Sequence, residues 1–244
     1  NVAPGLYPSP NLKQLSVCSN SWDLPVGRKS TLPCGRLGLK EVFMHVDTRQ
    51  RLLDIAEQLF AERGFYGVSI AAIASEVGVS KQGLLHYFNS KEKLYGTVLQ
   101  RISDDFQDQQ IRAQQASTTP LECLKQFYAG LAEPTETNTR RTRLLMRELL
   151  DNNVRAGETD KWYLRPFLER LTGMVKALDG LHQLKDEEAL VIAYQLLGAV
   201  NYYLISPATI SGIFGTDYLA EMSARFSFQL NLLVESLTSR SNDD

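Results

Sequence analysis

The stretch from Ser69 to Leu94, SIAAIASEVGVSKQGLLHYFNSKEKL, constrains the fold most strongly, because it carries the start and stop signals of three successive helices. Ser69, Ser80 and Ser90 each precede a helical segment, where a serine hydroxyl can accept a hydrogen bond from an unpaired N–H of the first turn. Gly78 ends the first segment, since glycine adopts the left-handed backbone conformation at little steric cost. We therefore predict two short helices separated by a tight turn and followed at once by a third helix.

The first two of these helices each have an apolar face that can pack inward. At helical spacing, the inward positions are Ile70, Ile73, Ala74 and Val77 in the first helix and Leu84, Leu85 and Phe88 in the second, with Val79 in the turn. The second helix presents five outward residues, none of them acidic: Lys81, Gln82, Gly83, His86 and Tyr87. Hydrogen-bonding side chains and a cation on one face suit DNA phosphates and base edges. An ordinary pair of packed helices is the alternative that these signals alone leave open.

The residues around this stretch form a longer pattern. Its features are Ala56, Leu59, Phe60, Gly64 and Phe65 at the end of a first helix, the pair Ile73 and Ala74, the turn Gly78, Val79 and Ser80, and Tyr87 and Phe88 followed by Lys91 and Leu94. In these residues, the run from Thr48 to Leu94 closely resembles the N-terminal domain of TetR/AcrR-type transcriptional regulators. The rest of the chain agrees with that family in length and helical character, without a motif of its own.

The resemblance implies an all-α fold with a three-helix helix-turn-helix DNA-binding domain at residues 44–93. A larger helical ligand-binding and dimerisation domain would follow at residues 94–244. In the family, the start of the first helix, the caps of the next helices and a Tyr–Lys clamp contact phosphates, and a helix N-terminus attracts anions by its own dipole. The expected DNA-binding residues are Thr48, Ser69, Ser80, Lys81, Gln82, Gly83, His86, Tyr87 and Lys91.

For three positions on the second reading helix, a role other than DNA contact remains open. His86 could be a solvated surface histidine, and Tyr87 could pack with its hydroxyl in water. Leu85 departs from the aromatic or polar residue that the family often has there, so we assign it no DNA contact.

Residues 1–43 differ in composition from the rest of the chain, because they hold five of the nine prolines and four of the sixteen glycines. We expect them to be mostly disordered, or a translated leader that precedes a native start at Met44. Codons for Lys40, Glu41 and Val42 can contain a bacterial ribosome-binding sequence, and different codons in the gene would contradict this hypothesis. A flexible arm that reaches DNA is the rival interpretation.

Composition excludes a chain that binds nucleic acid by its overall charge. The net charge is −2, with 43% hydrophobic and 22% charged residues, as in ordinary globular proteins. Between residues 45 and 93, six Lys and Arg residues balance six Asp and Glu residues. DNA binding therefore has to depend on dimerisation and on local placement of five cations, Arg49, Arg51, Lys81, Lys91 and Lys93.

Other functional classes find little support in the sequence. The cysteines (Cys18, Cys34 and Cys123) have no paired spacing, which argues against a disulfide framework or a zinc site and fits the cytoplasm. The histidines (His45, His86 and His182) are scattered, and no catalytic or nucleotide-binding motif is present. We expect no catalysis, no metal and no cofactor. We also see no apolar run that approaches a membrane span, so we expect no membrane partner.

Beyond Lys91 the chain is predicted to be almost entirely helical. The expected helices are residues 91–115, 121–131, 139–152, 159–178, 186–205 and 216–239. Pro166 lies inside the fourth of these, where it would kink the helix or mark its true beginning. Gly212 and Gly215 predict a loop before the last helix.

The last two helices suit a dimer interface. An apolar seam runs along the final helix at steps of three or four residues, although part of it must face the core of its own chain. The family dimerises through a four-helix bundle of such helices, and one short helix reads too few bases alone. The expected interface residues are Leu196, Val200, Leu219, Met222, Phe226, Leu230 and Leu233.

Between the two regions we expect an apolar cavity for a small molecule. The candidate lining residues are Phe127, Tyr128, Leu131, Leu145, Met146, Leu149, Trp162, Phe167 and Leu171, with Arg147, Glu148 and Asn152 as polar anchors. Each of them could equally be plain core or solvated surface. The resemblance implies that a ligand in such a cavity moves the helix after Lys91 and changes the spacing of the reading helices.

We therefore predict a cytoplasmic, homodimeric repressor that binds a double-stranded, palindromic DNA operator and is released by a small, lipophilic effector. The alternative is a DNA-binding interaction protein whose helical body engages a protein partner. A closed cavity would favour the first, and a filled core with an exposed apolar patch would favour the second.

Overall fold

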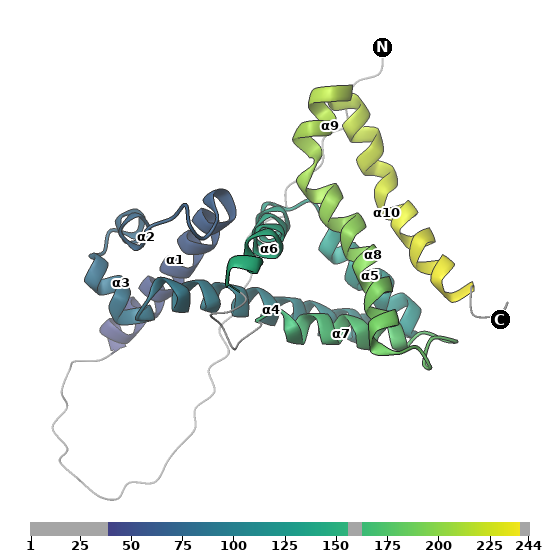
Figure 1. Ribbon diagram of the computed structural model, residues 1–244, viewed down its shortest axis with the longest axis horizontal. Coiled ribbons are helices and arrows are strands. Elements are labelled where there is room, and N and C mark those ends of the chain that lie inside the picture. The colour runs from purple at the N-terminus through teal and green to yellow at the C-terminus, as the bar shows by residue number, and fades with distance from the viewer. Residues whose placement is uncertain (1–38, 156–162, 240–244) are drawn as a thin grey trace, which may run out of the picture. The chain divides into compact units, whose positions relative to one another are not determined.

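The computed structural model describes residues 39–155 and 163–239, and these residues are helical apart from short turns (Figure 1). The all-α fold predicted from the sequence is therefore confirmed. The helices are α1 (Leu39–Arg63), α2 (Ile70–Val77), α3 (Lys81–Phe88), α4 (Lys91–Ala116), α5 (Pro120–Ala132), α6 (Glu136–Arg155), α7 (Arg165–Lys176), α8 (Asp186–Ile205), α9 (Pro207–Phe214) and α10 (Thr216–Ser239).

Helix α1 begins at Leu39, which is earlier than the start predicted near Thr48. The segment from Leu39 to Thr48 contains neither proline nor glycine, so nothing in it interrupts a helix. Helix α1 thus includes residues 39–43, the end of the stretch expected to be mostly disordered or a translated leader, and residues 1–38 lie outside the described part of the chain.

Helices α1, α2 and α3 form one core from the apolar residues predicted from the sequence. Phe60 of α1, Ile73 of α2 and Leu84 of α3 are fully or almost fully buried. Val79, in the turn between α2 and α3, packs against the same core, whereas Leu85 is only half-buried. The helix-turn-helix prediction is confirmed in both helices and in the turn between them.

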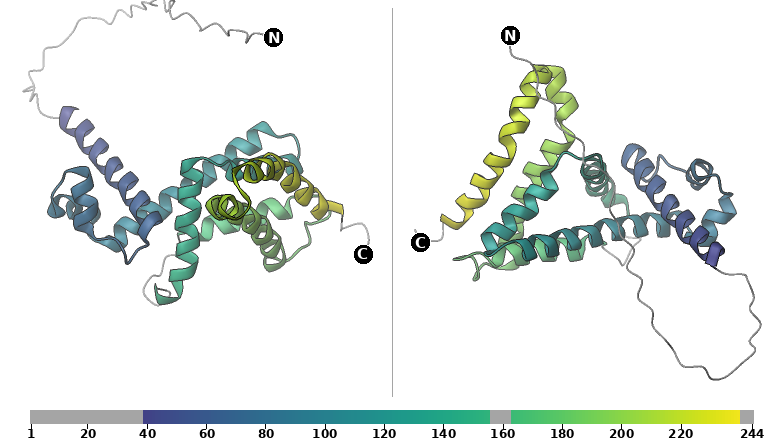
Figure 2. Two further views of the ribbon diagram at one scale, coloured as in Figure 1. Left: turned by 90° about the horizontal axis from the view of Figure 1, so that it is seen from above. Right: turned by 180° about the vertical axis from the view of Figure 1, so that it is seen from behind.

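Helix α4 connects this region to the rest of the described fold. Its buried edge contains Leu94, Val98, Ile102 and Phe106, at the four-residue spacing predicted. Its first half packs against α1, and its second half packs against α5 and α7 (Figures 1 and 2). A change in the direction of α4 would therefore move both regions.

Helix α7 begins at Arg165, with Pro166 in its first turn. Proline at a first-turn position costs no internal hydrogen bond, because that N–H would be unpaired in any case. Of the two interpretations left open for Pro166, the structure selects the one in which it marks the start of the helix.

Residues 207–214 form helix α9, so the loop predicted there is wrong. Pro207 stands in the first turn, and Gly215 ends the helix with a left-handed φ of 92°. The internal Gly212 costs only about 1 kcal/mol relative to alanine, which does not break a helix that is closed at both ends. Helix α9 joins α8 and α10, which run antiparallel to each other (Figure 2).

Helix α8 is long and apolar enough, by length and composition alone, to cross a membrane. That finding differs from the sequence expectation that no apolar run approaches a span. Packing accounts for part of the apolar character, since α8 contacts α5, α6, α7, α9 and α10 but only 33% of its apolar window is buried. Its first turn is also acidic, with Asp186, Glu187 and Glu188.

Candidate functional site

The outward face of α3 carries the residues predicted to read DNA. Lys81, Gln82 and His86 are exposed, while Leu84 and Phe88 on the opposite face are buried. This division places a cation, an amide and an imidazole together on a single helix face. Such groups can bond to phosphates and to base edges in a major groove.

Three serines fix the starts of the helices that surround this face. The Oγ of Ser69 accepts a hydrogen bond from the N–H of Ala72 at 3.1 Å, and the Oγ of Ser80 accepts one from Gly83 at 3.0 Å. At the start of α4, the Oγ of Ser90 accepts one from Lys93 at 3.2 Å. In the caps of Ser69 and Ser80 the hydroxyl accepts, so its hydrogen can be donated to a phosphate oxygen. The hydroxyl of Ser90 also forms a hydrogen bond with the carboxylate of Glu92.

Gly83 lies on α3 where no packing requires a glycine. A Cβ built there would lie 3.4 Å from the Oγ of Ser80 and 3.8 Å from the Cβ of Val79, which are ordinary contacts. Glycine usually weakens a helix, so its presence in the first turn points to a close approach from outside the chain. A DNA backbone is the partner that the surrounding residues suit.

Tyr87 and Lys91 lie close to this face and are both half-buried. The Nζ of Lys91 lies 4.4 Å from the ring centroid of Phe65. Burial lowers the pKa of Lys91 below its ordinary value, and the charge of Glu92 offsets part of that shift. Tyr87 packs against the core and also contacts the rings of His86 and Phe88.

Thr48 does not stand at a helix start, because α1 begins at Leu39. Thr48 was assigned a phosphate contact by resemblance, as a residue at the start of the first helix, and the supporting argument from a helix N-terminus does not apply to it. Its half-buried side chain lies well inside the helix, so a contact with DNA would have to come from that side chain alone.

Residues 45–93 contain equal numbers of acidic and basic side chains, but some of the acidic ones are paired with an arginine outside this region. Two of the acids in this region, Asp54 and Glu57 on α1, bind Arg101 of α4 at 2.6 Å and 2.5 Å. Burial opposes the charge of Arg101, but the hydrogen bonds and charges of Glu57 and Asp54 outweigh it and raise its pKa. These two carboxylates are thus neutralised from outside the region, which leaves Lys81 of α3 and the other cations of the region less opposed.

Helix α6 joins the helix-turn-helix region to the helical body. Arg147 donates hydrogen bonds to the carbonyl oxygens of Ala61 and Glu62 at 3.0 Å and 2.8 Å. Glu148 accepts one from the hydroxyl of Tyr95 at 2.7 Å. The prediction that Arg147 and Glu148 anchor a ligand is therefore wrong, because both are used between helices; the side chain of Asn152 lies outside the described residues.

An apolar cavity of about 360 Å³ lies between α6, α7 and α8. Five of the predicted residues line it, namely Leu131, Leu145, Met146, Leu149 and Phe167. Sequence reasoning missed its whole α8 wall, which includes Tyr194, Leu197, Asn201 and Tyr202, and also missed Asn138, Arg141 and Thr142 on α6. Helical spacing from Leu145 and Leu149 back to Thr142 and Asn138 could have identified the α6 residues.

Three predicted lining residues belong to the core instead. Phe127, Tyr128 and Leu171 are at most 1% exposed and do not line the cavity. Tyr128 donates a hydrogen bond to the carbonyl oxygen of Ala193 at 3.2 Å, and burial raises its pKa well above the ordinary value. Trp162 lies outside the described residues.

The predicted dimer residues divide between core and surface. Leu196, Val200 and Leu230 are at most 4% exposed within the single chain, so assigning them to an interface was wrong. Leu219, Met222 and Phe226 are half-buried, and Phe226 stacks on Tyr203 with ring centroids 3.8 Å apart. Leu233 is exposed.

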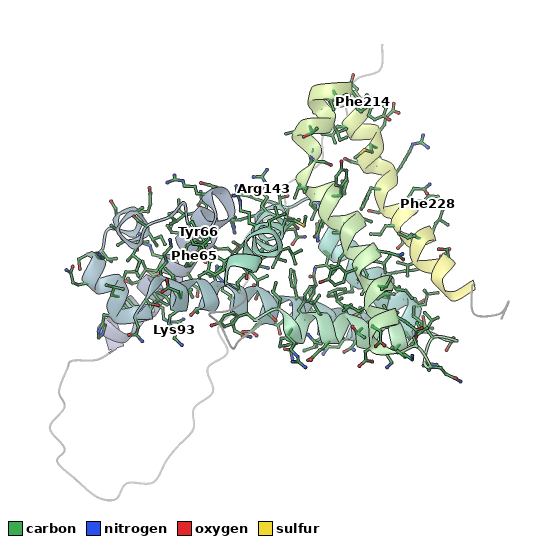
Figure 3. The ribbon with its side chains drawn as sticks, in the orientation of Figure 1. Phe65, Tyr66, Lys93, Arg143, Phe214 and Phe228 are labelled. Atoms are coloured by element: carbon green, nitrogen blue, oxygen red, sulfur yellow. The ribbon has the colours of Figure 1, made fainter. Side chains whose placement is uncertain are left out.

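A different apolar surface is exposed on α8 and α10. Phe228 projects from the outer side of α10 (Figure 3) and is 63% exposed. The other exposed apolar residues on these two helices are Val191, Tyr194, Tyr202, Tyr218, Leu232 and Leu233. Tyr194 and Tyr202 of this set also line the cavity. A face-to-face partner could bury the remaining residues.

Comparison with known proteins identifies a family for the helix-turn-helix region. Residues 52–98 match the family described as bacterial regulatory proteins, tetR family. The HTH-type transcriptional regulator RutR of Escherichia coli K12 is 34% identical over 131 residues, which cover 53% of this chain and 56% of RutR. The HTH-type transcriptional repressor NicS of Pseudomonas putida KT2440 is 24% identical over 188 residues, covering 73% of this chain and 85% of NicS. The match to RutR thus spans little more than half of that relative.

Solved structures share the fold over a longer range. A TetR-family transcriptional regulator from Rhodococcus sp. has a TM-score of 0.58 at 12% identity, over 79% of this chain and 99% of that one. The fatty acid degradation regulator FadR from Bacillus halodurans has a TM-score of 0.55 at 17% identity, over 75% of this chain and 94% of that one. At these identities the likeness shows the arrangement of helices.

Proposed function

We propose that the chain is a TetR-family transcriptional regulator, namely a cytoplasmic repressor that binds a palindromic operator as a homodimer and is released by a small molecule. The match of residues 52–98 to the tetR family and the similarity to RutR support this proposal. The exposed face of α3 carries the DNA-binding part of this proposal, since Lys81, Gln82 and His86 face outward from a helix that is capped and buried on its other side.

In the proposed complex, α3 enters the major groove with its N-terminal residues towards the bases. The capped starts of α2 and α3 direct N–H groups and serine hydroxyls at the flanking phosphates. Lys91 and Tyr87 hold the phosphate beside the C-terminal end of α3. The contacts to phosphates set the position, and the contacts from Lys81, Gln82 and His86 supply the sequence preference.

Two copies of α3 are needed to read an operator. The exposed apolar surface on α8 and α10 supports a two-fold dimer, in which the same surface on each protomer buries its counterpart. The two half-sites would then lie roughly one helical turn of DNA apart, about 34 Å, or somewhat more.

The cavity between α6, α7 and α8 supports control by a ligand, although it is open to solvent where Leu149, Tyr194 and Tyr202 line it. Its volume, about 360 Å³, lies within the usual range for small-molecule sites. Most of its lining is apolar, which suits a lipophilic molecule. The ligand releases DNA only if it binds more tightly to the arrangement of helices that does not fit the operator.

Binding of the full chain to DNA from immediately upstream of its own gene tests this function. Fluorescence anisotropy in a salt series should show tight, salt-sensitive binding that is selective over random DNA, and a Tyr87→Phe, Lys91→Ala double variant should lose it. Equal affinity of the wild-type chain for the upstream and the random DNA would count against an operator at that place. The same affinity in the wild-type chain and the double variant would reject the assigned face.

A further inference from the structure

The cavity carries a single charge. Among the described residues that line it, Arg141 is the one ionised side chain; the other polar ones are neutral, such as Asn138, Thr142 and Asn201. Arg141 is thus the charged group of the described lining with which an anionic ligand could pair, in competition with the carboxylates of Asp105 and Glu57 that already face it.

Arg141 also belongs to a cluster of ion pairs outside the cavity. Its Nη2 pairs with the carboxylate of Asp105 on α4, and its Nε lies 3.6 Å from the Oε1 of Glu57 on α1. That second separation is too long for a hydrogen bond, and the Nε is buried without a hydrogen-bond partner. Arg141 therefore touches the cavity, α1 and α4 together, and its existing partners do not satisfy it fully.

Glu57 is the centre of this cluster. Its side chain is 1% exposed. It forms ion pairs with Arg101 of α4 at 2.5 Å and with Arg140 of α6 at 3.1 Å, and Arg141 lies beside them. A buried carboxylate of this kind depends on its cations for stability. Displacement of Arg141 would therefore affect α1, which packs directly against α2, the first helix of the helix-turn-helix.

We propose that the effector is an amphiphile with an apolar body and one carboxylate, that the carboxylate pairs with Arg141, and that this pairing weakens the contacts of Arg141 with Asp105 and Glu57. This inference rests on the proposed function for its regulatory part, whereas the binding part stands without DNA.

The charge count and shape of the site favour a carboxylate. Because the carboxylates of Asp105 and Glu57 already face Arg141, a ligand with one negative charge meets less repulsion there than a phosphate, which would bring up to two. The planar fork of an arginine fits the two oxygens of a carboxylate. The leucines, phenylalanines and tyrosines of the lining leave room for an alkyl or aromatic body.

The pairing would act on DNA binding by competition. An effector carboxylate and Asp105 would compete for the same guanidinium, so the ligand favours the state in which α4 and α6 are less firmly joined. Linkage requires the reverse effect as well, so bound operator should weaken the affinity for the effector by the same factor.

Isothermal titration calorimetry on the full chain tests the binding part. The probes are straight-chain carboxylates from hexanoate to dodecanoate, each beside the alcohol of equal chain length. We expect at least one carboxylate to bind roughly tenfold or more tightly than its alcohol, as a charge-assisted contact predicts. Equal affinity of acid and alcohol at every length, or no binding of any acid, would overturn the inference.

Three variants locate the contact. Arg141→Gln should remove the preference for the acid and leave the affinity for the alcohol unchanged. Arg143→Gln is the matched control, because Arg143 is an exposed arginine on the same helix (Figure 3) and does not line the cavity. Asp105→Asn removes the competing carboxylate, so it should bind the acid several-fold more tightly than the wild type. A loss of binding in Asp105→Asn, or an unchanged preference in Arg141→Gln, would contradict the inference.

Operator binding in the presence of the best acid separates this inference from the proposed function. Release of DNA by the acid in the wild type and in Arg143→Gln, but not in Arg141→Gln, supports both. If the acid binds through Arg141 and no operator is bound, the proposed function fails and the ligand assignment stands. If the operator is bound and the acid preference is absent, the ligand assignment fails alone.

Discussion

Replacement of Gly83 should affect the stability of the fold and the affinity for DNA in opposite directions. Replacing it with alanine should raise the stability of the isolated chain by up to about 1 kcal/mol, since alanine favours a helix and the new Cβ meets only ordinary contacts. The same Cβ would point at the DNA, so operator affinity should fall roughly tenfold, about 1.4 kcal/mol. Thermal unfolding and anisotropy measure the two effects; reduced stability, or unchanged affinity, would contradict the assigned close approach.

Lys91 should contribute to DNA binding through its charge. If each protomer places it on one phosphate, Lys91→Gln in a dimer removes two contacts and reduces the slope of log affinity against log salt by about 2. Lys185→Gln serves as the control, because Lys185 is exposed at the start of α8, far along the chain from α3. An equal change of slope in both variants would indicate that only overall charge matters.

At the scale of elements, the ion pairs of Glu57 should stabilise the joint between α1, α4 and α6. Glu57→Gln leaves three arginines without their shared, buried carboxylate, so the free energy of unfolding should fall by roughly 3 kcal/mol or more. Glu62→Gln, at an exposed position on the same helix, should change it by no more than about 0.5 kcal/mol. Chemical denaturation measures both, and similar values for the two variants would reject a structural role for the cluster.

The sequence was most informative where the signals are local. Ser69, Ser80 and Gly78 act within a few residues, so their caps and the lengths of α2 and α3 could be predicted and are confirmed. Helix α9 was missed because two glycines were given more weight than Pro207 at its start.

The cavity could be predicted only in part, because its walls come from helices far apart in the sequence. Apolar content does not distinguish Phe127, which is core, from Phe167, which lines the cavity. Nor could periodicity show that Arg147 reaches back to α1. These assignments depend on tertiary contacts that no local pattern encodes.

At the scale of the whole molecule, dimerisation should depend on the outer surface of α8 and α10. A Phe228→Glu, Leu232→Glu double variant places two charges on that surface and should shift the protein to monomers in analytical ultracentrifugation. Ile111→Glu is a control at a partly exposed apolar position on α4. If the double variant stays dimeric, another surface forms the interface.

Selection from a random double-stranded DNA library shows whether α3 reads an operator, since every possible operator sequence competes for the protein at once. We expect enrichment of a two-fold symmetric sequence, bound roughly a thousandfold or more tightly than random DNA at moderate salt. A Gln82→Ala, His86→Ala variant lacks two of the side chains assigned to base edges, so it should not enrich that sequence. No enriched sequence, or enrichment of the same sequence by that variant, would contradict the assignment of α3 as the reading helix.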